Sequence, residues 1–366
     1  MKLTVMFTIM YAFLAIQASG QQLFKGTEAL VKSEFIFRSG EVPFPSCHAS
    51  TIAETNTGLI AAWFGGTKEK DPDVTIWISR YENGKWSMPE SVANGRQKNK
   101  KRFPTWNPVL FNTGRKINLY YKVGPSPREW WGEVISSEDN GHTWSEPVKL
   151  PEGILGPIKN KPVILSGGWL VSPSSTEDHG WQVHVEISRD TGKTWTSTPP
   201  LNNPEKLSLI QPAILEHRNG KVQILCRSKN NAVFSSWSSD NGLTWGPFTS
   251  IGLPNPNSGI DAVTTNDGKY ILVYNHISCK PGDYWGDRNI LNVALSNDGL
   301  LWKAAILLEN DPDKDAEYSY PAVIQTKDGM IHITYTWNRK LIKHVVIDPL
   351  KIKTKDYIHG KWPVKD

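Results

Sequence analysis

The chain has 366 residues, a net charge of +5, 3 cysteines and 16 tryptophans. An odd number of cysteines leaves at least one thiol unpaired, so a disulfide framework does not hold this fold together. The positive charge is mild and dispersed, and no recognisable nucleic-acid-binding module accompanies it, which argues against that class of protein. No cysteine or histidine pair has zinc-binding spacing and no acidic loop matches a calcium-binding hand, so we expect neither a metal nor a cofactor.

The N-terminus has the three parts of an export signal. Lys2 is followed by an apolar run over residues 3–16, and small residues occupy positions 18–20. This pattern predicts a secretory signal peptide over residues 1–20 and a single mature domain over residues 21–366. No later apolar stretch is long enough for a membrane span. We therefore expect a periplasmic or extracellular protein, without a membrane span and monomeric.

The motif S-x-D-x-G-x-T-W occurs three times, beginning at Ser137, Ser188 and Ser238, and degenerate copies begin at Ser79 and Ser296. The last tryptophans of these five copies are 50 to 58 residues apart. Asp and Gly favour a tight turn in which the carboxylate caps backbone amides, and Trp packs beneath it. The regular spacing of this Asp-box indicates a repeat protein with one supersecondary unit per repeat.

A second repeat consists of two apolar, alternating segments joined by a turn, and its period of two residues is typical of β-strands. Six copies occur, over residues 49–64, 108–121, 162–172, 212–226, 262–274 and 321–336. Together with the Asp-boxes, they predict an all-β fold, a six-bladed β-propeller with four strands per blade. A strand near residues 34–38 is expected to close the ring by joining the last blade.

In a propeller, the starts of the first strands and the ends of the second strands open onto the same face. The residues expected there are polar or aromatic, and a buried ring of such groups needs a ligand or water to satisfy it. The first-strand set is His48, Asn107, Lys161, Gln211, Asp261 and Tyr318, and the second-strand set is Trp63, Lys122, Ser174, Arg227, His276 and residues 337–339. This ring predicts a binding site at the mouth of the central axis.

Three segments resemble those of the sialidase superfamily, and the likeness extends over essentially the whole mature chain. They are residues 222–227 before an Asp-box, residues 288–296, and residues 317–319 before a strand. Sialidases are six-bladed propellers that bind a substrate carboxylate with three arginines and use a tyrosine nucleophile paired with a glutamate. The resemblance implies that Arg227 and Arg288 bind a carboxylate and that Tyr318 is the reactive tyrosine.

The chain departs from the sialidase pattern at two places. Residues 45–48 read Pro-Ser-Cys-His where the family carries its first arginine, and Gln211 stands in the place of the glutamate. Glutamine cannot act as a base, so the usual activation of the tyrosine is missing. A tyrosine and histidine beside a carboxylate grip instead resemble the propeller lyases that act on uronates.

The leading hypothesis is β-elimination on uronate-containing oligosaccharides from acidic plant or algal polysaccharides, by a lyase or a dehydratase. Arg227 and Arg288 would hold the carboxylate, while His48 and Tyr318 would remove the C5 proton and protonate the C4 leaving group. The remaining substrate-binding candidates are Asn107, Lys161, Gln211, Asp261, His276, Trp337 and Arg339.

Two alternatives remain open on the sequence. An exo-acting glycoside hydrolase would use Tyr318 as nucleophile and Asp71 or Asp73 as acid/base, because these aspartates lie on the loop that carries this residue in sialidases. A non-catalytic glycan-binding propeller would bind an acidic oligosaccharide without turning it over. Product mass and the effect of changing His48 distinguish the three.

Overall fold

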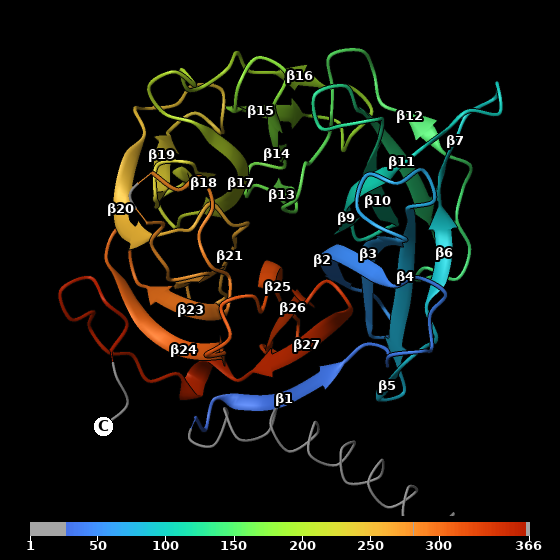
Figure 1. The fold of residues 1–366 in the computed structure, drawn as a ribbon. Coiled ribbons are helices and arrows are strands. Elements are labelled where there is room, and N and C mark those ends of the chain that lie inside the picture. The colour runs from blue at the N-terminus through green and yellow to red at the C-terminus, as the bar shows by residue number, and fades with distance from the viewer. Residues whose placement is uncertain (1–26, 281, 364–366) are drawn as a thin grey trace, which may run out of the picture.

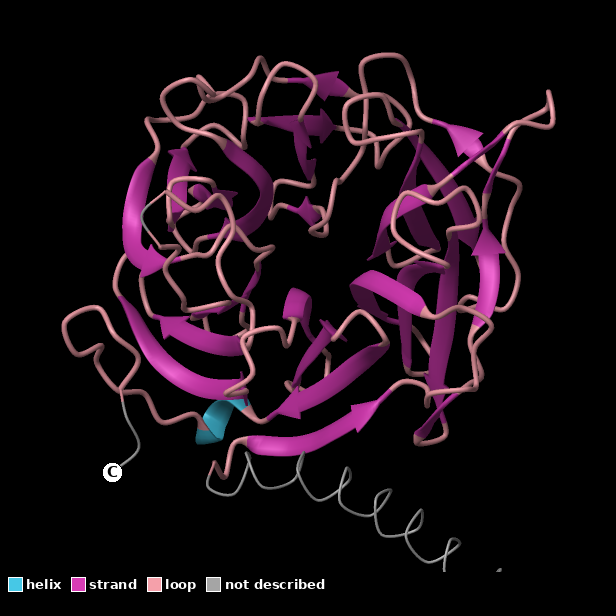
Figure 2. Cartoon of the chain, in the orientation of Figure 1, coloured by secondary structure: helices cyan, strands magenta, loops and turns pink. Residues whose placement is uncertain are grey.

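The computed structural model describes residues 27–280 and 282–363, and in them six antiparallel sheets surround a central axis (Figures 1 and 2). The prediction of an all-β, six-bladed propeller is confirmed. The predicted signal peptide over residues 1–20 lies outside the described residues.

The blades follow one another along the chain, and each runs from an inner strand at the axis to an outer strand. Blade 1 contains β2 (Ser46–Glu54), β3 (Leu59–Gly66), β4 (Thr75–Glu82), β5 (Lys85–Trp86) and β6 (Glu90–Ala93). Blade 2 contains β9 (Thr105–Asn112), β10 (Ile117–Val123), β11 (Trp131–Ser137) and β12 (Val148–Lys149). Blade 3 contains β13 (Val163–Ile164), β14 (Leu170–Thr176), β15 (Gln182–Ser188) and β16 (Thr196–Ser197).

Blade 4 contains β17 (Leu209–Glu216), β18 (Val222–Ser228), β19 (Ala232–Ser238) and β20 (Thr249–Pro254). Blade 5 contains β21 (Asp261–Thr264), β22 (Tyr270–Tyr274), β23 (Ile290–Ser296) and β24 (Trp302–Asn310). Blade 6 contains β25 (Tyr318–Gln325), β26 (Ile331–Trp337), β27 (Leu341–Ile347) and β1 (Leu30–Phe35). A small hairpin, β7 (Gly95–Arg96) and β8 (Arg102–Phe103), and the short 3₁₀ helix η1 (Pro349–Lys351) complete the described elements.

The ring is closed by strands from both ends of the chain, as the sequence predicts. β1 pairs antiparallel with β27, from Leu30 opposite Ile347 to Phe35 opposite Lys343. The last blade is therefore complete only when the first strand has joined it (Figure 1). Opening the ring requires breaking this ladder and the side-chain contacts across it.

The Asp-boxes form the predicted turns at the ends of the third strands. The Ser137 hydroxyl donates to Asp139 Oδ1 at 2.8 Å and accepts from the Gly141 amide at 2.8 Å, and Asp139 Oδ1 also accepts from the Thr143 amide at 2.8 Å. Hydrogen bonds from the Thr143 hydroxyl and amide and from Ser137 hold the pKa of Asp139 below its usual range. Because third strands end at the edge opposite to the starts of first strands, these turns support the fold and lie away from the axial mouth.

Four inner strands contain a β-bulge at the same place. Ala49, Asn107, Gln211 and Tyr320 have positive φ angles of 58°, 39°, 54° and 52°, and the pairing register of each strand shifts beside them. Such a backbone conformation costs about 1–3 kcal/mol for a residue other than glycine. A bulge also redirects the side chains on either side of it, which decides the residues that face the axis.

Two buried histidines lie at the ring closure. His332 Nδ1 is 2.9 Å from His344 Nε2, and His344 Nδ1 is 3.1 Å from Glu34 Oε1 on β1. Burial and the neighbouring His344 lower the pKa of His332 from 6.5 to about 4. Between these two pKa values the unfolded chain therefore binds a proton at His332 that the folded protein does not bind.

This arrangement predicts acid sensitivity of the folded state. Between pH 6.5 and about 4 the unfolded chain binds more protons at His332 than the folded chain, so the free energy of unfolding falls as the pH falls through this window. We expect a loss on the order of 1–3 kcal/mol from this group. Thermal melts at several pH values should show a smaller pH dependence for His332→Gln than for the natural protein, and an equal dependence would contradict this explanation.

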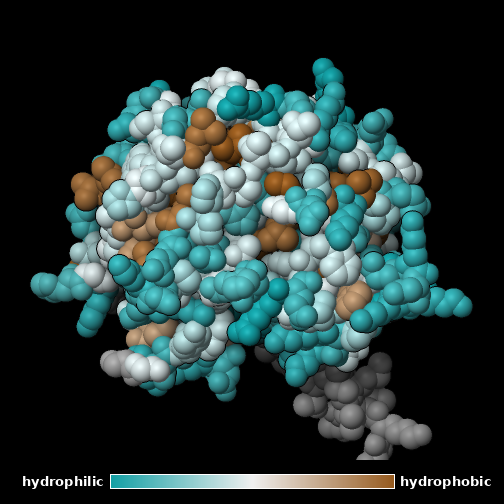
Figure 3. Space-filling view, turned by 90° about the horizontal axis from the view of Figure 1, so that it is seen from above, coloured by the Kyte–Doolittle hydropathy of each residue, from teal (hydrophilic) through white to brown (hydrophobic). Residues whose placement is uncertain are grey.

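The side seen in Figure 3 is largely hydrophilic, with separate small apolar areas. Large exposed apolar side chains include Leu301, Leu350 and Met88, which belong to different parts of the chain. Across residues 27–280 and 282–363, no helix is long and apolar enough to cross a membrane.

Candidate active site

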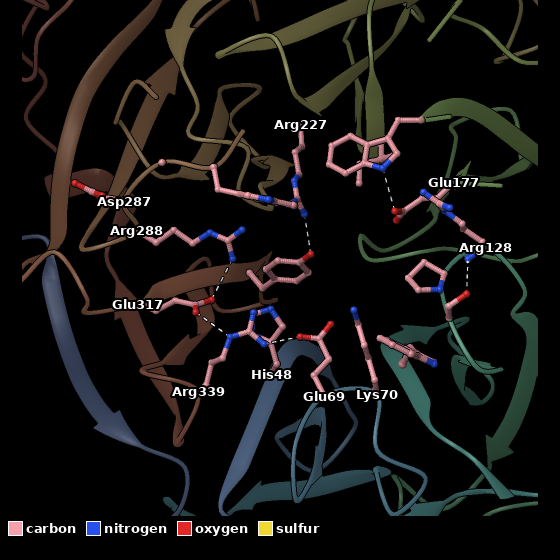
Figure 4. A pocket seen from close by; sticks show the side chains of 18 of the residues that line it. His48, Glu69, Lys70, Arg128, Glu177, Arg227, Asp287, Arg288, Glu317 and Arg339 are labelled. Atoms are coloured by element: carbon pink, nitrogen blue, oxygen red, sulfur yellow. Dashed lines mark hydrogen bonds and ion pairs between the residues drawn. The ribbon is translucent and has the colours of Figure 1, made fainter. Parts of the chain in front are cut away.

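A pocket of about 1060 Å³ opens at the mouth of the axis, where the sequence predicts a site (Figure 4). Its volume lies at the upper end of the sizes typical of small-molecule sites, about 300–1,000 Å³. Strands contribute His48, Trp106, Ile210, Arg227 and Tyr320, and loops contribute Glu69, Lys70, Ser126, Pro127, Arg128, Glu129, Glu177, Trp181, Trp285, Gly286, Asp287, Arg288, Lys314, Asp315, Ala316, Glu317 and Arg339.

Arg227 is held rigidly at the end of β18. Its Nε donates to Asn257 Oδ1 at 3.0 Å, and its Nη1 donates to Gln211 Oε1 at 3.1 Å and to the Tyr320 hydroxyl at 2.7 Å. Its side chain is almost fully buried, and among the described residues no acceptor bonds its second terminal nitrogen, Nη2. A fixed guanidinium with a remaining donor suits a carboxylate ligand.

Two further arginines of the pocket, Arg288 and Arg339, belong to an alternating chain of charges (Figure 4). Arg288 Nη1 lies 3.1 Å from Glu317 Oε1, and Arg339 Nε lies 2.8 Å from Glu317 Oε2. Arg339 Nη1 also lies 2.5 Å from Glu69 Oε2. Burial alone would raise the pKa of Glu317, but its electrostatic interactions with His48, then Arg288 and Arg339, hold it below its usual range. Two carboxylates thus offset two of the arginines, while Arg227 keeps its charge without an acidic hydrogen-bond partner in the described chain.

Arg339 comes from the turn between β26 and β27, and its carbonyl accepts a hydrogen bond from the Cys47 amide at 2.8 Å. It therefore lies beside the start of β2, the segment in which the sequence lacks the first arginine of the sialidase pattern. The guanidinium groups of Arg227, Arg288 and Arg339 consequently line the same part of one pocket, which Arg128 also lines from the opposite wall. Arg339, a predicted substrate-binding residue, is among the lining residues.

His48 lies deep in the pocket beside Tyr320. Its Nδ1 is 3.0 Å from the Thr336 hydroxyl, and its ring centroid is 4.1 Å from that of Tyr320. Burial, followed by the positive charge of Arg339, lowers the pKa of His48 well below 6.5. The imidazole is therefore neutral at neutral pH and able to accept a proton.

The prediction that Tyr318 faces the two arginines is wrong. The Tyr318 hydroxyl donates to Asp311 Oδ2 at 2.7 Å and its ring packs against Trp337, outside the pocket. The reason is the bulge in β25, where Tyr320 has a left-handed backbone and the strand loses its alternation. Tyr320 is the tyrosine that lines the pocket.

β-Bulges also explain why two predicted ligands, in blades 2 and 4, do not line the pocket. Asn107 and Gln211 are themselves the bulged residues, and the pocket is lined by the preceding residues, Trp106 and Ile210. Gln211 reaches the site indirectly, through its hydrogen bond to Arg227. Each of Asn107, Gln211 and Tyr320 precedes a proline, and this repeated pair is the signal from which the bulges could have been inferred.

Two further predicted ligands, Lys161 and Asp261, form an inter-blade brace. Lys161 Nζ lies 3.0 Å from Asp261 Oδ2, which also accepts from the Val323 amide at 2.8 Å. This brace joins the segment before blade 3 to blades 5 and 6. Neither side chain lines the pocket, so their prediction as sugar ligands is wrong.

His276 and Trp337 also lie outside the pocket. His276 Nδ1 is 2.5 Å from the Tyr274 hydroxyl and its Nε2 is 2.9 Å from the Gly360 carbonyl. Trp337 packs against Phe35 with the ring centroids 5.4 Å apart. Both side chains therefore pack against the outer parts of the fold and do not line the predicted site.

The loop between β3 and β4 does reach the pocket, but through other residues than predicted. Asp73 accepts from the Thr67 amide and hydroxyl at 2.9 and 2.8 Å and so holds the loop, and Asp71 does not line the pocket. Glu69 and Lys70 are the loop residues that point into it (Figure 4).

Glu177 is a pocket residue that the sequence reasoning missed. It lies on the wall opposite Arg288, next to Arg128 (Figure 4), and its Oε2 accepts from Trp181 Nε1 at 3.0 Å. Burial raises the pKa of Glu177. It was missed, like Glu69, because it belongs to a connecting loop where no strand period identifies inward-facing residues.

Solved structures with this fold include sialidases. A Hadza microbial sialidase, Hz136, superposes with a TM-score of 0.74 at 16% identity, over 88% of this chain and 69% of its own. A protein of unknown function from Dyadobacter fermentans gives 0.70 at 18% identity, over 89% of this chain and 100% of its own. The leech intramolecular trans-sialidase superposes with a TM-score of 0.67 at 13% identity, over 92% of this chain and 72% of its own. These identities establish likeness of fold.

No curated protein matches the chain in sequence. The sequence model of the BNR repeat-like domain, in contrast, matches residues 57–333, which is most of the propeller. This stretch includes the five Asp-box copies and most of the strands that carry the pocket. The chain therefore belongs to the BNR repeat-like domain family and has the sialidase-like six-bladed propeller fold.

Proposed function

We propose that this protein is a glycan-cleaving enzyme that binds the carboxylate of an acidic sugar through Arg227 and Arg288. We further propose that it cleaves uronate-containing oligosaccharides by β-elimination. The observation that carries the proposal is the 2.7 Å hydrogen bond from Arg227 Nη1 to the Tyr320 hydroxyl, beside neutral His48. A cation suited to binding a carboxylate, Arg227, and two groups suited to acid–base catalysis, His48 and Tyr320, thereby lie in one pocket.

The elimination removes the proton at C5 of the uronate, forms a double bond between C4 and C5, and breaks the bond from C4 to its oxygen substituent. The proton goes to an enzyme base, and the leaving oxygen receives a proton from an enzyme acid. Binding the carboxylate to Arg227 and Arg288 stabilises the negative charge that develops next to C5. No oxidant or water is consumed.

His48 is suited to the role of base and Tyr320 to that of acid. Neutral imidazole has a free electron pair for the C5 proton, and the Thr336 hydroxyl 3.0 Å from Nδ1 orients the ring. The Tyr320 oxygen accepts from Arg227, so its own proton remains available for the leaving group. The positive charge of Arg227 then stabilises the phenolate that forms. After product release His48 gives its proton to solvent and Tyr320 takes one up, which restores the starting state.

Hydrolysis is the second candidate, and Glu69 is the observation that favours it. Glu69 lies in the pocket on the loop where sialidases carry their acid/base residue, and the chain shares its fold with sialidases. Tyr320 would then attack the anomeric carbon. Against this, no carboxylate among the described residues bonds the Tyr320 hydroxyl, whereas sialidases activate the tyrosine with a glutamate.

Incubation with a panel of oligosaccharides that carry a C4-substituted or a terminal uronate, and of sialylated oligosaccharides, separates these functions. Elimination is expected to raise ultraviolet absorbance, because an unsaturated uronate forms. The sugar products together have the mass of the substrate when the C4 leaving group is a sugar, and one water less when it is the C4 hydroxyl. Products heavier by one water, without the absorbance, would overturn elimination in favour of hydrolysis. Binding without any product would indicate a glycan-binding propeller.

The pH profile of turnover follows from the environment of His48. Because burial and Arg339 hold its pKa well below 6.5, the base form persists under mildly acidic conditions. We expect kcat/KM to remain level from neutral pH to clearly below pH 6.5, provided the rate is measured where the fold is intact by circular dichroism. An acidic limb at pH 6.5 or above that disappears in His48→Gln would contradict this assignment.

A further inference from the structure

A second, smaller pocket of about 320 Å³ adjoins the first one. Pro127, Arg128 and Glu177 line both pockets, so the two pockets are neighbours with one wall in common. The second pocket is further lined by Trp130, Trp131, Lys149, Leu150, Pro151, Glu152, Gly153, Ile154, Leu155, Thr176, Asp178 and His184. The proposed reaction in the first pocket uses none of these residues.

The wall of this pocket is preformed by backbone contacts. The Leu150 amide donates to the Gly132 carbonyl at 2.9 Å, and the amides of Leu155 and Gly156 donate to the buried Glu186 carboxylate, each at 2.7 Å. A Cβ atom at Gly132 would lie 2.3 Å from the Leu155 carbonyl oxygen, so this glycine permits the close approach. The segment over residues 150–156 is therefore held in place without a ligand.

The lining combines an aromatic face with apolar side chains. The Trp131 indole is half-buried, its Nε1 donates to Glu133 Oε1 at 2.8 Å, and the Lys149 ammonium lies 5.3 Å from its ring centroid. Leu150 and Ile154 add apolar surface. A fixed aromatic ring with polar groups around it is the usual means of binding the apolar face of a sugar ring.

Acidic side chains outnumber basic ones in the lining of the second pocket. Arg128 and Lys149 are positive, while Glu152, Glu177 and Asp178 are negative. The second pocket therefore does not select an anionic group.

We propose that the second pocket is a subsite for a neutral sugar residue of the same oligosaccharide whose acidic residue occupies the first pocket. The occupant follows from the wall that the two pockets share at Arg128 and Glu177. An oligosaccharide that crosses this wall places one sugar residue in each pocket. This inference rests on the proposed binding of an acidic sugar. It makes the preferred substrate a heteroglycan in which a uronate is joined to neutral sugars.

The test uses a substitution at an exposed turn that places a large side chain in the second pocket. Glu152→Trp places a large ring at the lining, and Glu146→Trp makes the same change at an exposed residue of the preceding loop that lines neither pocket. The probes are glucuronic acid, a glucuronosyl-galactose disaccharide and trisaccharides that extend it by galactose, arabinose, rhamnose or glucose. Calorimetry gives the dissociation constant of each.

We expect at least one of these oligosaccharides to bind the natural protein about tenfold more tightly than glucuronic acid, and Glu152→Trp to abolish that gain while Glu146→Trp retains it. Equal affinities for all probes, or a gain that survives in Glu152→Trp, would overturn the subsite. Failure of the proposed function has a different signature. In that case Arg227→Met leaves the affinity for the disaccharide unchanged, whatever the effect of Glu152→Trp.

Discussion

Replacing Arg227 by methionine is expected to lower kcat/KM about 10²- to 10⁴-fold. The change removes the charge that binds the substrate carboxylate and the donor that holds the Tyr320 hydroxyl. Hydrogen bonds to charged groups contribute about 1.5–3 kcal/mol each, and two of them account for this range. Steady-state kinetics on the best substrate of the panel provide the measurement.

The control for this variant is Arg189→Met. Arg189 is exposed and lies over the Trp169 ring, outside the pocket. It should retain activity within about twofold, as expected for a surface substitution. Circular dichroism and melting temperature establish that Arg227→Met is folded. A folded Arg227→Met with unchanged kcat/KM would contradict the assigned role of this residue.

The second large effect distinguishes two tyrosines that lie two residues apart. Tyr320→Phe removes only a hydroxyl at the pocket and is expected to lower kcat about 10²- to 10⁴-fold, the usual contribution of an acid–base group. Tyr318→Phe removes a hydroxyl that bonds Asp311 outside the pocket. It should keep kcat and lower the free energy of unfolding by about 1 kcal/mol.

This pair of variants also tests the bulge in β25. Without the bulge, strand alternation would put both tyrosines on one face. Loss of activity in Tyr318→Phe together with normal activity in Tyr320→Phe would show that the chain uses the other tyrosine, against the geometry of the pocket. Urea denaturation of both variants reports the stability change.

The fold could be predicted from the sequence because its determinants are local. Each Asp-box needs only Ser, Asp, Gly and Trp within eight residues, as in the stretch from Ser137 to Trp144, and the tight turn follows from their short-range hydrogen bonds. The alternation of apolar residues with a period of two then identifies the strands that build the blades. The closing strand was predictable because a propeller leaves one outer position unfilled at its ends.

The site could be predicted only in part. His48, Arg227 and Arg288 line the pocket as expected, since two lie at strand ends and the third just before β23. The tyrosine was displaced because a left-handed residue before a proline breaks the alternation on which the prediction depends. Residues on the loops that connect strands, such as Glu69 and Glu177, follow no period, so only the folded chain brings them to the axis.

The substitution of glutamine for glutamate has a structural consequence at the reactive tyrosine. Gln211 accepts from Arg227 Nη1 at 3.1 Å, and the same nitrogen donates to Tyr320. The phenol therefore faces a cation where a sialidase provides a base. This contact favours a tyrosine that gives up its proton to a leaving group over one that acts as a nucleophile activated by a carboxylate.

Binding of a uronate and of its methyl ester tests most directly whether the pocket recognises a carboxylate. The two ligands have nearly the same shape and differ in the charge that Arg227 and Arg288 are proposed to bind. Calorimetry should give a dissociation constant for the glucuronosyl-galactose acid at least about tenfold lower than for its methyl ester, and the difference should vanish in Arg227→Met. Equal affinity of the natural protein for the acid and the ester would contradict the account.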